Sequence, residues 1–208
     1  MKWYVYYYII VFILILFIVI RIFNFNETNT IKSLNSLDSL NTGDLVFVKY
    51  DNSLGYLMRL WSGSKWTHMG MIYRNEIGDL FVMETANYSK DKGVLLIPLY
   101  RWQRFNKNCE ISIMKLNAPD DFDRNVLYEN FQKLKGKKLD TFNTKWIRLI
   151  TKHKYKNLSE QQNITCYELI VHILQESNIV KKIYSPSSYF PKDFIDKNIP
   201  YETGFSYS

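Results

Sequence analysis

A cysteine in the last quarter of the chain, Cys166, lies where a thiol would be able to act as a nucleophile. Thr165 and Glu168 have the spacing of a capping box, which closes the first turn of a helix. Ile164 and Leu169 have the spacing of a hydrophobic staple across the same helix start. Cys166 is therefore predicted at the first helical position, where free backbone N–H groups and the helix dipole favour an anion. A thiolate is such an anion, so this position predicts a reactive thiol.

A structural role for the same cysteine stays open on this stretch alone. Residues at helical spacing here are Cys166, Leu169, Ile170 and Ile173. Such spacing is typical of a buried helix face, and a free cysteine is often a small buried hydrophobic residue. The second cysteine, Cys109, opens an apolar strand pattern and is predicted to be structural. One disulfide between the two cysteines is also open, although two cysteines make no disulfide framework.

A histidine and a glutamate become neighbours in a predicted β-hairpin. The loop Glu76–Gly78 suits a three-residue connection in which the glycine supplies a positive φ. This loop puts Gly70 opposite Glu84, so His68 lies diagonal to Glu84 on the same face of the sheet. A slip of one residue would put the two side chains on opposite faces. Such a pair is either a structural contact or a base with the carboxylate that orients it.

The elements that position these residues alternate between strands and short helices. Strands are predicted at 44–48, 66–73, 79–84, 93–98 and 109–116. Helices are predicted at 54–61, 100–105 and 120–134, with a last helical turn from Pro191. The helix 120–134 should be capped by Asp120 or Asp121 and should point Phe131 and Leu134 inward. His172, four residues after Glu168, is expected to form an exposed pair with it on the polar face of the Cys166 helix.

The order of these pieces resembles the permuted papain-like amidases of the NlpC-type superfamily. A Gly43–Asp44 turn opens the first strand, Thr67–Gly70 lies on the second, Glu84 ends the third and Thr165–Cys166 starts a helix. In papain the cysteine helix precedes the histidine strand, whereas in the permuted proteins the histidine comes first, as here. The branch that the pattern resembles is the YaeF/YiiX group, which includes poxvirus members. The resemblance covers residues 43–194.

The resemblance implies an α+β fold, in which an antiparallel sheet packs against helices and one helix carries the nucleophile. It implies that Cys166 is the nucleophile, His68 the general base and Glu84 the group that orients the imidazole. The backbone N–H of Cys166 would supply half of an oxyanion hole. Tyr167 is expected to bind substrate. Neither a cofactor nor a metal ion is expected, because no CxxC or Cys/His cluster supports a metal site.

The N-terminal residues predict a membrane anchor. Residues 3–20 carry no charge, are almost wholly apolar and have the length of a membrane-spanning helix of about 20 residues. A cleaved signal peptide is the alternative, but the apolar run is too long for its core and no small-residue cleavage site follows. The predicted organisation is therefore a transmembrane anchor at 1–23, a linker at 24–41 and a catalytic domain at 42–208.

The net charge of +7 leaves the kind of partner open. Residues 133–156 contain eight Lys, one Arg and only Asp140 as an acid, which suits either a solvated loop or contact with anionic headgroups. No nucleic-acid-binding motif accompanies this charge, so no nucleic acid partner is expected. A glycan on the sequon that begins at Asn163 would crowd Cys166, which favours a cytosolic domain on a single-pass membrane protein.

Three functions compete at this point. The first is a cysteine hydrolase that cuts an amide, ester or thioester bond in a lipid or peptide through an acyl-enzyme. The second is a catalytically silent, membrane-anchored binding or assembly protein. The third is a lipid acyltransferase, which differs from the first only in the acceptor. Acyltransferases of similar layout usually have a second histidine where Glu84 stands, so this residue favours the hydrolase.

Overall fold

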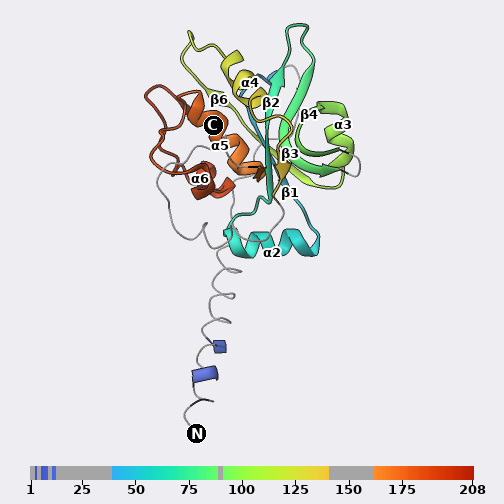
Figure 1. The fold of residues 1–208 in the computed structure, drawn as a ribbon, viewed down its shortest axis with the longest axis vertical. Helices are drawn as coiled ribbons and strands as arrows, with labels where there is room; N and C mark the ends of the chain where they lie inside the picture. The colour runs from blue at the N-terminus through green and yellow to red at the C-terminus, as the bar shows by residue number, and fades with distance from the viewer. Residues whose placement is uncertain (1–2, 4–5, 9–10, 13–38, 89–90, 141–161) are drawn as a thin grey trace.

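A computed structural model describes residues 39–88, 91–140 and 162–208, together with residues 3, 6–8 and 11–12 (Figure 1). The elements of the first half are β1 (Leu45–Lys49), α2 (Ser53–Ser62), β2 (His68–Arg74), β3 (Leu80–Tyr88), β4 (Asp91–Pro98), α3 (Leu99–Phe105) and β5 (Glu110–Met114). The second half contains β6 (Leu116–Asn117), α4 (Asn125–Gln132), β7 (Lys138–Leu139), β8 (Asn163–Ile164), α5 (Cys166–Glu176), η3 (Pro186–Ser188), α6 (Pro191–Ile195) and β9 (Ser206–Tyr207).

A five-stranded antiparallel sheet with the order β4-β3-β2-β1-β5 forms the centre of the fold. Its β2–β3 hairpin has the predicted loop, because Asn75 N donates to Asp79 O at 3.0 Å and Gly78 has a φ of +92°. Met71 pairs with Met83, so one step further along the ladder Gly70 lies opposite Glu84. The predicted α+β class, sheet and hairpin register are confirmed.

The two faces of the sheet pack against different helices because successive side chains of a strand alternate between faces. One face packs against α5 and includes Leu45, Phe47, Met69, Met71 and Met83. The other face packs against α3 and includes Val46, Val48, Ile72 and Val82. Figure 1 draws α5 and α3 on opposite sides of the sheet. Helix α5, which begins with Cys166, therefore packs into one hydrophobic core. The sheet face that carries His68 and Glu84 packs into the other core.

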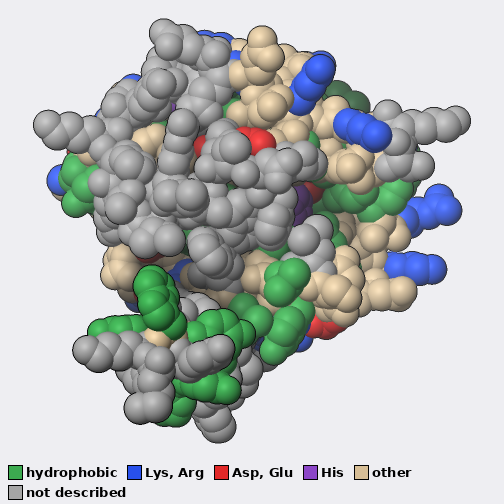
Figure 2. All heavy atoms as spheres, turned by 60° about the horizontal axis from the view of Figure 1, so that its bottom comes forward, with side chains coloured by type: hydrophobic (Ala, Val, Ile, Leu, Met, Phe, Trp, Pro, Cys, Tyr) green, Lys and Arg blue, Asp and Glu red, His purple; other side chains and the backbone are tan. Residues whose placement is uncertain are grey.

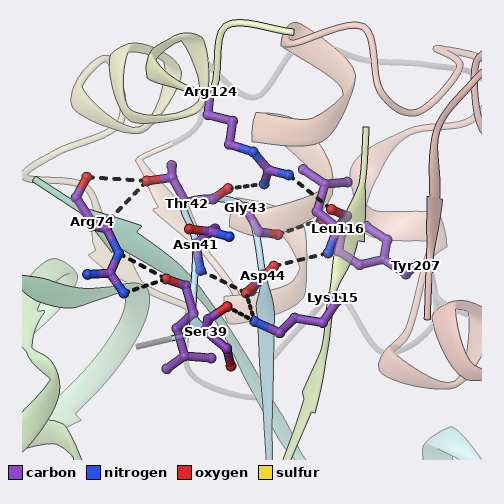
Figure 3. A network of polar contacts seen from close by, with 11 residues as sticks. Ser39, Asn41, Thr42, Gly43, Asp44, Arg74, Lys115, Leu116, Arg124 and Tyr207 are labelled. Atoms are coloured by element: carbon purple, nitrogen blue, oxygen red, sulfur yellow. Dashed lines mark hydrogen bonds and ion pairs between the residues drawn. The ribbon is translucent and has the colours of Figure 1, made fainter. Parts of the chain in front are cut away.

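A network of polar contacts fixes residues 39–44, the first residues of the domain, to the strands around them (Figure 3). The buried Asp44 carboxylate accepts hydrogen bonds from Asn41 N at 2.9 Å and Leu116 N at 3.1 Å, and from the Lys115 ammonium at 2.8 Å. The Arg74 guanidinium donates twice to the carbonyl of residue 40, at 3.0 and 2.8 Å. The end of the predicted linker is thus bonded to β2 and to the β5–β6 connection.

The predicted helix 120–134 is shorter than expected, and its predicted cap at Asp120 or Asp121 is wrong. Helix α4 starts at Asn125, and the residue before it makes no side-chain cap. A turn precedes the helix instead, in which Phe122 N donates to the carbonyl of residue 119. The ring of Phe122 then packs edge-on against Phe205, with the ring centroids 5.1 Å apart. This contact with the C-terminal segment explains why the local capping signal did not decide the helix start.

Helix α5 is buried on every side from Cys166 to Gln175. The prediction that His172 and Glu168 form an exposed pair is wrong, because their exposed fractions are 5% and 1%. The Glu168 carboxylate binds the helix N-terminus instead. Helix α4 and η3 contact α5 and cover the side that was expected to face solvent.

Burial of His172 predicts a loss of stability in acid. Burial lowers its pKa to about 4, with a smaller opposing contribution from Glu176. Below pH ~6.5 the unfolded chain binds a proton that the folded chain does not, so stability falls as the pH drops from about 6.5 to about 4. The total loss should be on the order of 3 kcal/mol. Urea unfolding at several pH values should show a shallower acid decline for His172→Leu than for wild type, and parallel declines would exclude His172 as the cause.

Candidate active site

His68 and Glu84 meet directly on one face of the sheet. The ring nitrogen Nε2 of His68 lies 2.6 Å from Oε2 of Glu84. Both side chains are buried, with exposed fractions of 7% and 0%. His68 is the first residue of β2 and Glu84 lies within β3, so the hairpin register alone brings them together. The predicted proximity of the two side chains is confirmed, and the Glu84 carboxylate binds one nitrogen of the imidazole, Nε2.

Trp102 holds the same carboxylate from the other side. Its indole Nε1–H donates to Oε2 of Glu84 at 3.0 Å, and its side chain is fully buried. Two donors on one oxygen restrict the rotation of the carboxylate and hence the plane of the His68 ring. The sequence analysis placed Trp102 in a short helix without a role. No spacing rule connects a residue of α3 with the middle of β3, so no sequence signal pointed to this contact.

Cys166 is the first residue of α5, as predicted from its capping box. Thr165 Oγ1 accepts a hydrogen bond from Glu168 N at 3.3 Å, and Thr165 N donates to Glu168 Oε2 at 2.8 Å. The cysteine is free and its exposed fraction is 6%. The helix N-terminus therefore presents a nearly buried thiol beside backbone N–H groups that favour negative charge.

Cys166 is one of the groups that lie near enough to His68 to influence the pKa of its imidazole. Burial by itself lowers the pKa of His68, but nearby Tyr50 and Cys166 and the hydrogen bond with Glu84 raise it. The net pKa of His68 lies well above its usual value of 6.5. Because Nε2 is bound to Glu84, Nδ1 is the ring nitrogen left for the thiol.

Tyr50 packs against His68 and was also missed by the sequence analysis. The two ring centroids lie 5.9 Å apart. The Tyr50 hydroxyl donates to Oδ1 of the buried Asn106 at 3.1 Å, and Asn106 Nδ2 in turn donates to Trp102 O at 3.0 Å. Burial raises the pKa of Tyr50. The imidazole is thus flanked by an aromatic ring that is itself tied to the helix carrying Trp102.

Tyr167 lines a small surface pocket with a volume of about 10 Å³. Its exposed fraction is 8%, and its ring centroid is 5.6 Å from that of Phe190. Burial raises the pKa of the Tyr167 hydroxyl. The residues that line the pocket are Met58, Ser62, Trp66, Thr67, Tyr167, Phe190 and Pro191. The substrate-binding role of Tyr167 stays a prediction; the structure adds only that Tyr167 lines this pocket.

Other residues that the sequence singled out lie outside this arrangement. Cys109 precedes β5, is half-buried and is free, so the possible disulfide with Cys166 does not form. In the described part of the chain, no group of three or more His, Cys, Asp or Glu side chains is arranged to hold a metal ion. None of the described helices is long and apolar enough to cross a membrane. Most of the predicted anchor at 1–23 and most of the basic segment 133–156 lie outside the described residues.

Comparison with known proteins gives one informative result. A scan against protein-family models and a search of curated proteins found no match. Among solved structures, the chain is similar to the metalloprotein yiiX from Escherichia coli O157:H7, described as DUF1105. The TM-score is 0.51 at 15% sequence identity, and the alignment covers 81% of this chain and 96% of yiiX. At this identity the likeness shows a shared fold, and this is the fold of the branch that the sequence pattern resembles.

Proposed function

We propose that this protein is a cysteine hydrolase in which Cys166 is the nucleophile, His68 the general base and Glu84 the residue that orients the imidazole. The observation that carries the proposal is the arrangement around His68. One ring nitrogen binds the buried Glu84 carboxylate at 2.6 Å, and the Cys166 thiol at the start of α5 is among the groups near enough to influence the pKa of His68. A nucleophile, a base and a group that orients the base are the three parts that covalent acyl transfer requires.

The reaction proceeds through an acyl-enzyme. The Cys166 thiolate attacks the carbonyl carbon of an amide, ester or thioester and forms a C–S bond, and the negative oxygen lies near the Cys166 backbone N–H. The protonated His68 gives its proton to the leaving amine, alcohol or thiol as the old bond breaks. His68 then accepts a proton from water, whose oxygen attacks the thioester, and the carboxylic acid leaves Cys166 free.

Thiol alkylation tests the proposal without knowledge of the substrate. At pH 7 iodoacetamide should modify Cys166 faster than the half-buried Cys109, because the imidazolium of His68 favours the thiolate. In His68→Ala the rate at Cys166 should fall on the order of ten- to thirtyfold, and its pH profile should move to higher pH. Peptide mapping by mass spectrometry measures both sites in one sample. If the rate and profile at Cys166 are the same with and without His68, the silent binding protein becomes the better interpretation.

We also propose that residues 1–23 anchor the enzyme in a membrane, since residues 3–20 are uncharged and long enough to span one. The full chain should then stay in the membrane pellet after alkaline carbonate extraction. Deletion of residues 1–23 should move the protein to the supernatant with an unchanged far-ultraviolet circular dichroism spectrum. Release of the full chain by carbonate would contradict the anchor.

A further inference from the structure

One oxygen of the Glu84 carboxylate lacks a hydrogen bond, although the side chain is fully buried. Both donors that bind Glu84, His68 Nε2 at 2.6 Å and Trp102 Nε1 at 3.0 Å, reach Oε2. Among the described residues, no donor lies within hydrogen-bond distance of Oε1. Water has little access to the pair, because the exposed fraction of His68 is 7%, and Figure 2 shows only small patches of histidine on the face that it views. A buried oxygen of this kind is costly, so a third donor is expected close to it.

Tyr88 carries a hydroxyl on the same strand that can supply this donor. It lies four residues after Glu84 in β3, and residues an even number apart share one face of a strand. Its ring stacks on that of Phe105, with the centroids 4.3 Å apart, which holds the ring between the sheet and α3. Burial raises the pKa of the Tyr88 hydroxyl, and the nearby Glu84 carboxylate raises it further. The hydroxyl therefore keeps its proton at neutral pH and lies close to the carboxylate.

The buried side chain of Asn106 determines which hydroxyl donates and which accepts in this group. Its exposed fraction is 1%, and its Nδ2 donates to the Trp102 carbonyl oxygen at 3.0 Å. A carbonyl oxygen can only accept, so this bond fixes the orientation of the amide. Oδ1 of Asn106 then faces Tyr50, whose hydroxyl donates to it at 3.1 Å. Nδ2 also donates to the Tyr88 hydroxyl oxygen, at 3.4 Å.

These bonds give the two tyrosine hydroxyls opposite roles. The single proton of the Tyr50 hydroxyl is used in its bond to Asn106, so this hydroxyl has only lone pairs left for another neighbour. The Tyr88 hydroxyl accepts from Asn106 and therefore keeps its own proton for a second acceptor. Oε1 of Glu84 is a buried acceptor near Tyr88 that lacks a donor.

We infer that Tyr88 donates a hydrogen bond to Oε1 of Glu84, and that Asn106 is the positioning residue that leaves the Tyr88 proton free to do so. The two atoms stop short of a hydrogen bond in the structure, so a small side-chain movement closes it. The inference rests on the proposed function and deepens it. With a third donor the buried carboxylate stays ionised, and the proton that the pair shares stays on His68. Tyr88 and Asn106 thus act on the reaction through Glu84.

Tyr88→Phe in the full-length protein tests the inference, because it removes the hydroxyl and keeps the ring that stacks on Phe105. Without this donor the buried charge on Glu84 is less stable, so the shared proton lies more often on Glu84 and His68 is more often neutral. A neutral His68 favours the Cys166 thiolate less. Iodoacetamide should therefore alkylate Cys166 about three- to tenfold more slowly at pH 7, and the pH profile of the reaction should move to higher pH.

Two matched controls separate this effect from a general loss of stability. Tyr73→Phe also removes one hydroxyl from a half-buried ring, which stacks on Tyr128 with the centroids 4.0 Å apart, but Tyr73 packs against the other core. Asn106→Leu should slow the alkylation as much as Tyr88→Phe. Asn130→Leu changes another buried asparagine, which binds Ser177 at 2.9 Å on the side of α4. Both control variants should keep the wild-type rate and pH profile at the reactive thiol.

Combined variants show whether the residues act through one contact. In a His68→Ala background, Tyr88→Phe should not slow the alkylation further, because its effect passes through the imidazole. Tyr88→Phe/Asn106→Leu should be no slower than the slower single variant, because both changes remove the same hydrogen bond. Losses that multiply in either combination would overturn the inference.

The outcomes separate this inference from the proposed function. If Cys166 reacts equally fast with and without His68, the catalytic proposal itself fails. If the rate at Cys166 depends on His68 but Tyr88→Phe behaves like Tyr73→Phe, the inference is wrong while the catalytic proposal stands. Equal effects of Asn106→Leu and its asparagine control would exclude Asn106 as the positioning residue. Should Asn106→Leu fail to fold, Tyr88→Phe, which removes a single oxygen atom, still decides.

Discussion

Cys166→Ala should reduce hydrolysis of a small acyl thioester by about a thousandfold or more, because the proposed acyl-enzyme cannot form without the thiol. His68→Ala should cause a loss of similar size, since His68 both stabilises the thiolate and transfers protons in each step. Release of the thiol product, followed in a spectrophotometer, measures the rate. Mass spectrometry of the wild-type protein during turnover should show an acyl adduct on the peptide that contains Cys166.

The double variant gives this prediction its sharpest form. Groups that act as one unit have non-additive effects, so Cys166→Ala/His68→Ala should be only slightly slower than either single variant. Cys109→Ala, which changes a cysteine outside the site, should keep wild-type turnover. If the losses of the two single variants multiply in the double variant, Cys166 and His68 act independently and the proposed mechanism is wrong.

Glu84→Ala should lower the free energy of unfolding by about 3–5 kcal/mol, the usual cost of breaking a buried charged pair. The Glu84 carboxylate is fully buried and accepts hydrogen bonds from both His68 and Trp102. Its removal leaves two buried N–H groups without an acceptor and opens a cavity. Urea unfolding monitored by circular dichroism at pH 7 measures the difference.

Two further variants identify the source of that cost. Glu84→Gln keeps the side-chain volume and one carbonyl acceptor, so its loss of stability should be clearly smaller. Trp102→Phe removes only one donor and should also cost less than Glu84→Ala. A penalty for Glu84→Ala below about 1 kcal/mol would contradict the reading of Glu84 as the buried centre of the network.

Local sequence rules were sufficient for the parts of the site that depend on neighbouring residues. The capping box of Thr165 and Glu168 places Cys166 at the first helical position because all its hydrogen bonds form within one turn. The loop at Glu76–Gly78 sets the register between His68 and Glu84 because a short loop admits one pairing of the strands it joins. Both features are decided by interactions over a few residues.

Only the tertiary structure determines which distant side chains contact these local elements. Trp102 reaches Glu84, and Tyr50 reaches His68, only because α3 and the end of β1 pack beside the hairpin. His172 is buried because α4 and η3 cover a helix side whose sequence reads as polar. Periodicity reports which face of an element is apolar, but it carries no information on which distant segment covers that face. The proximity of Cys166 and His68 depends on such packing, because the two residues lie on separate elements. The resemblance to a known fold, not a local rule, predicted this proximity.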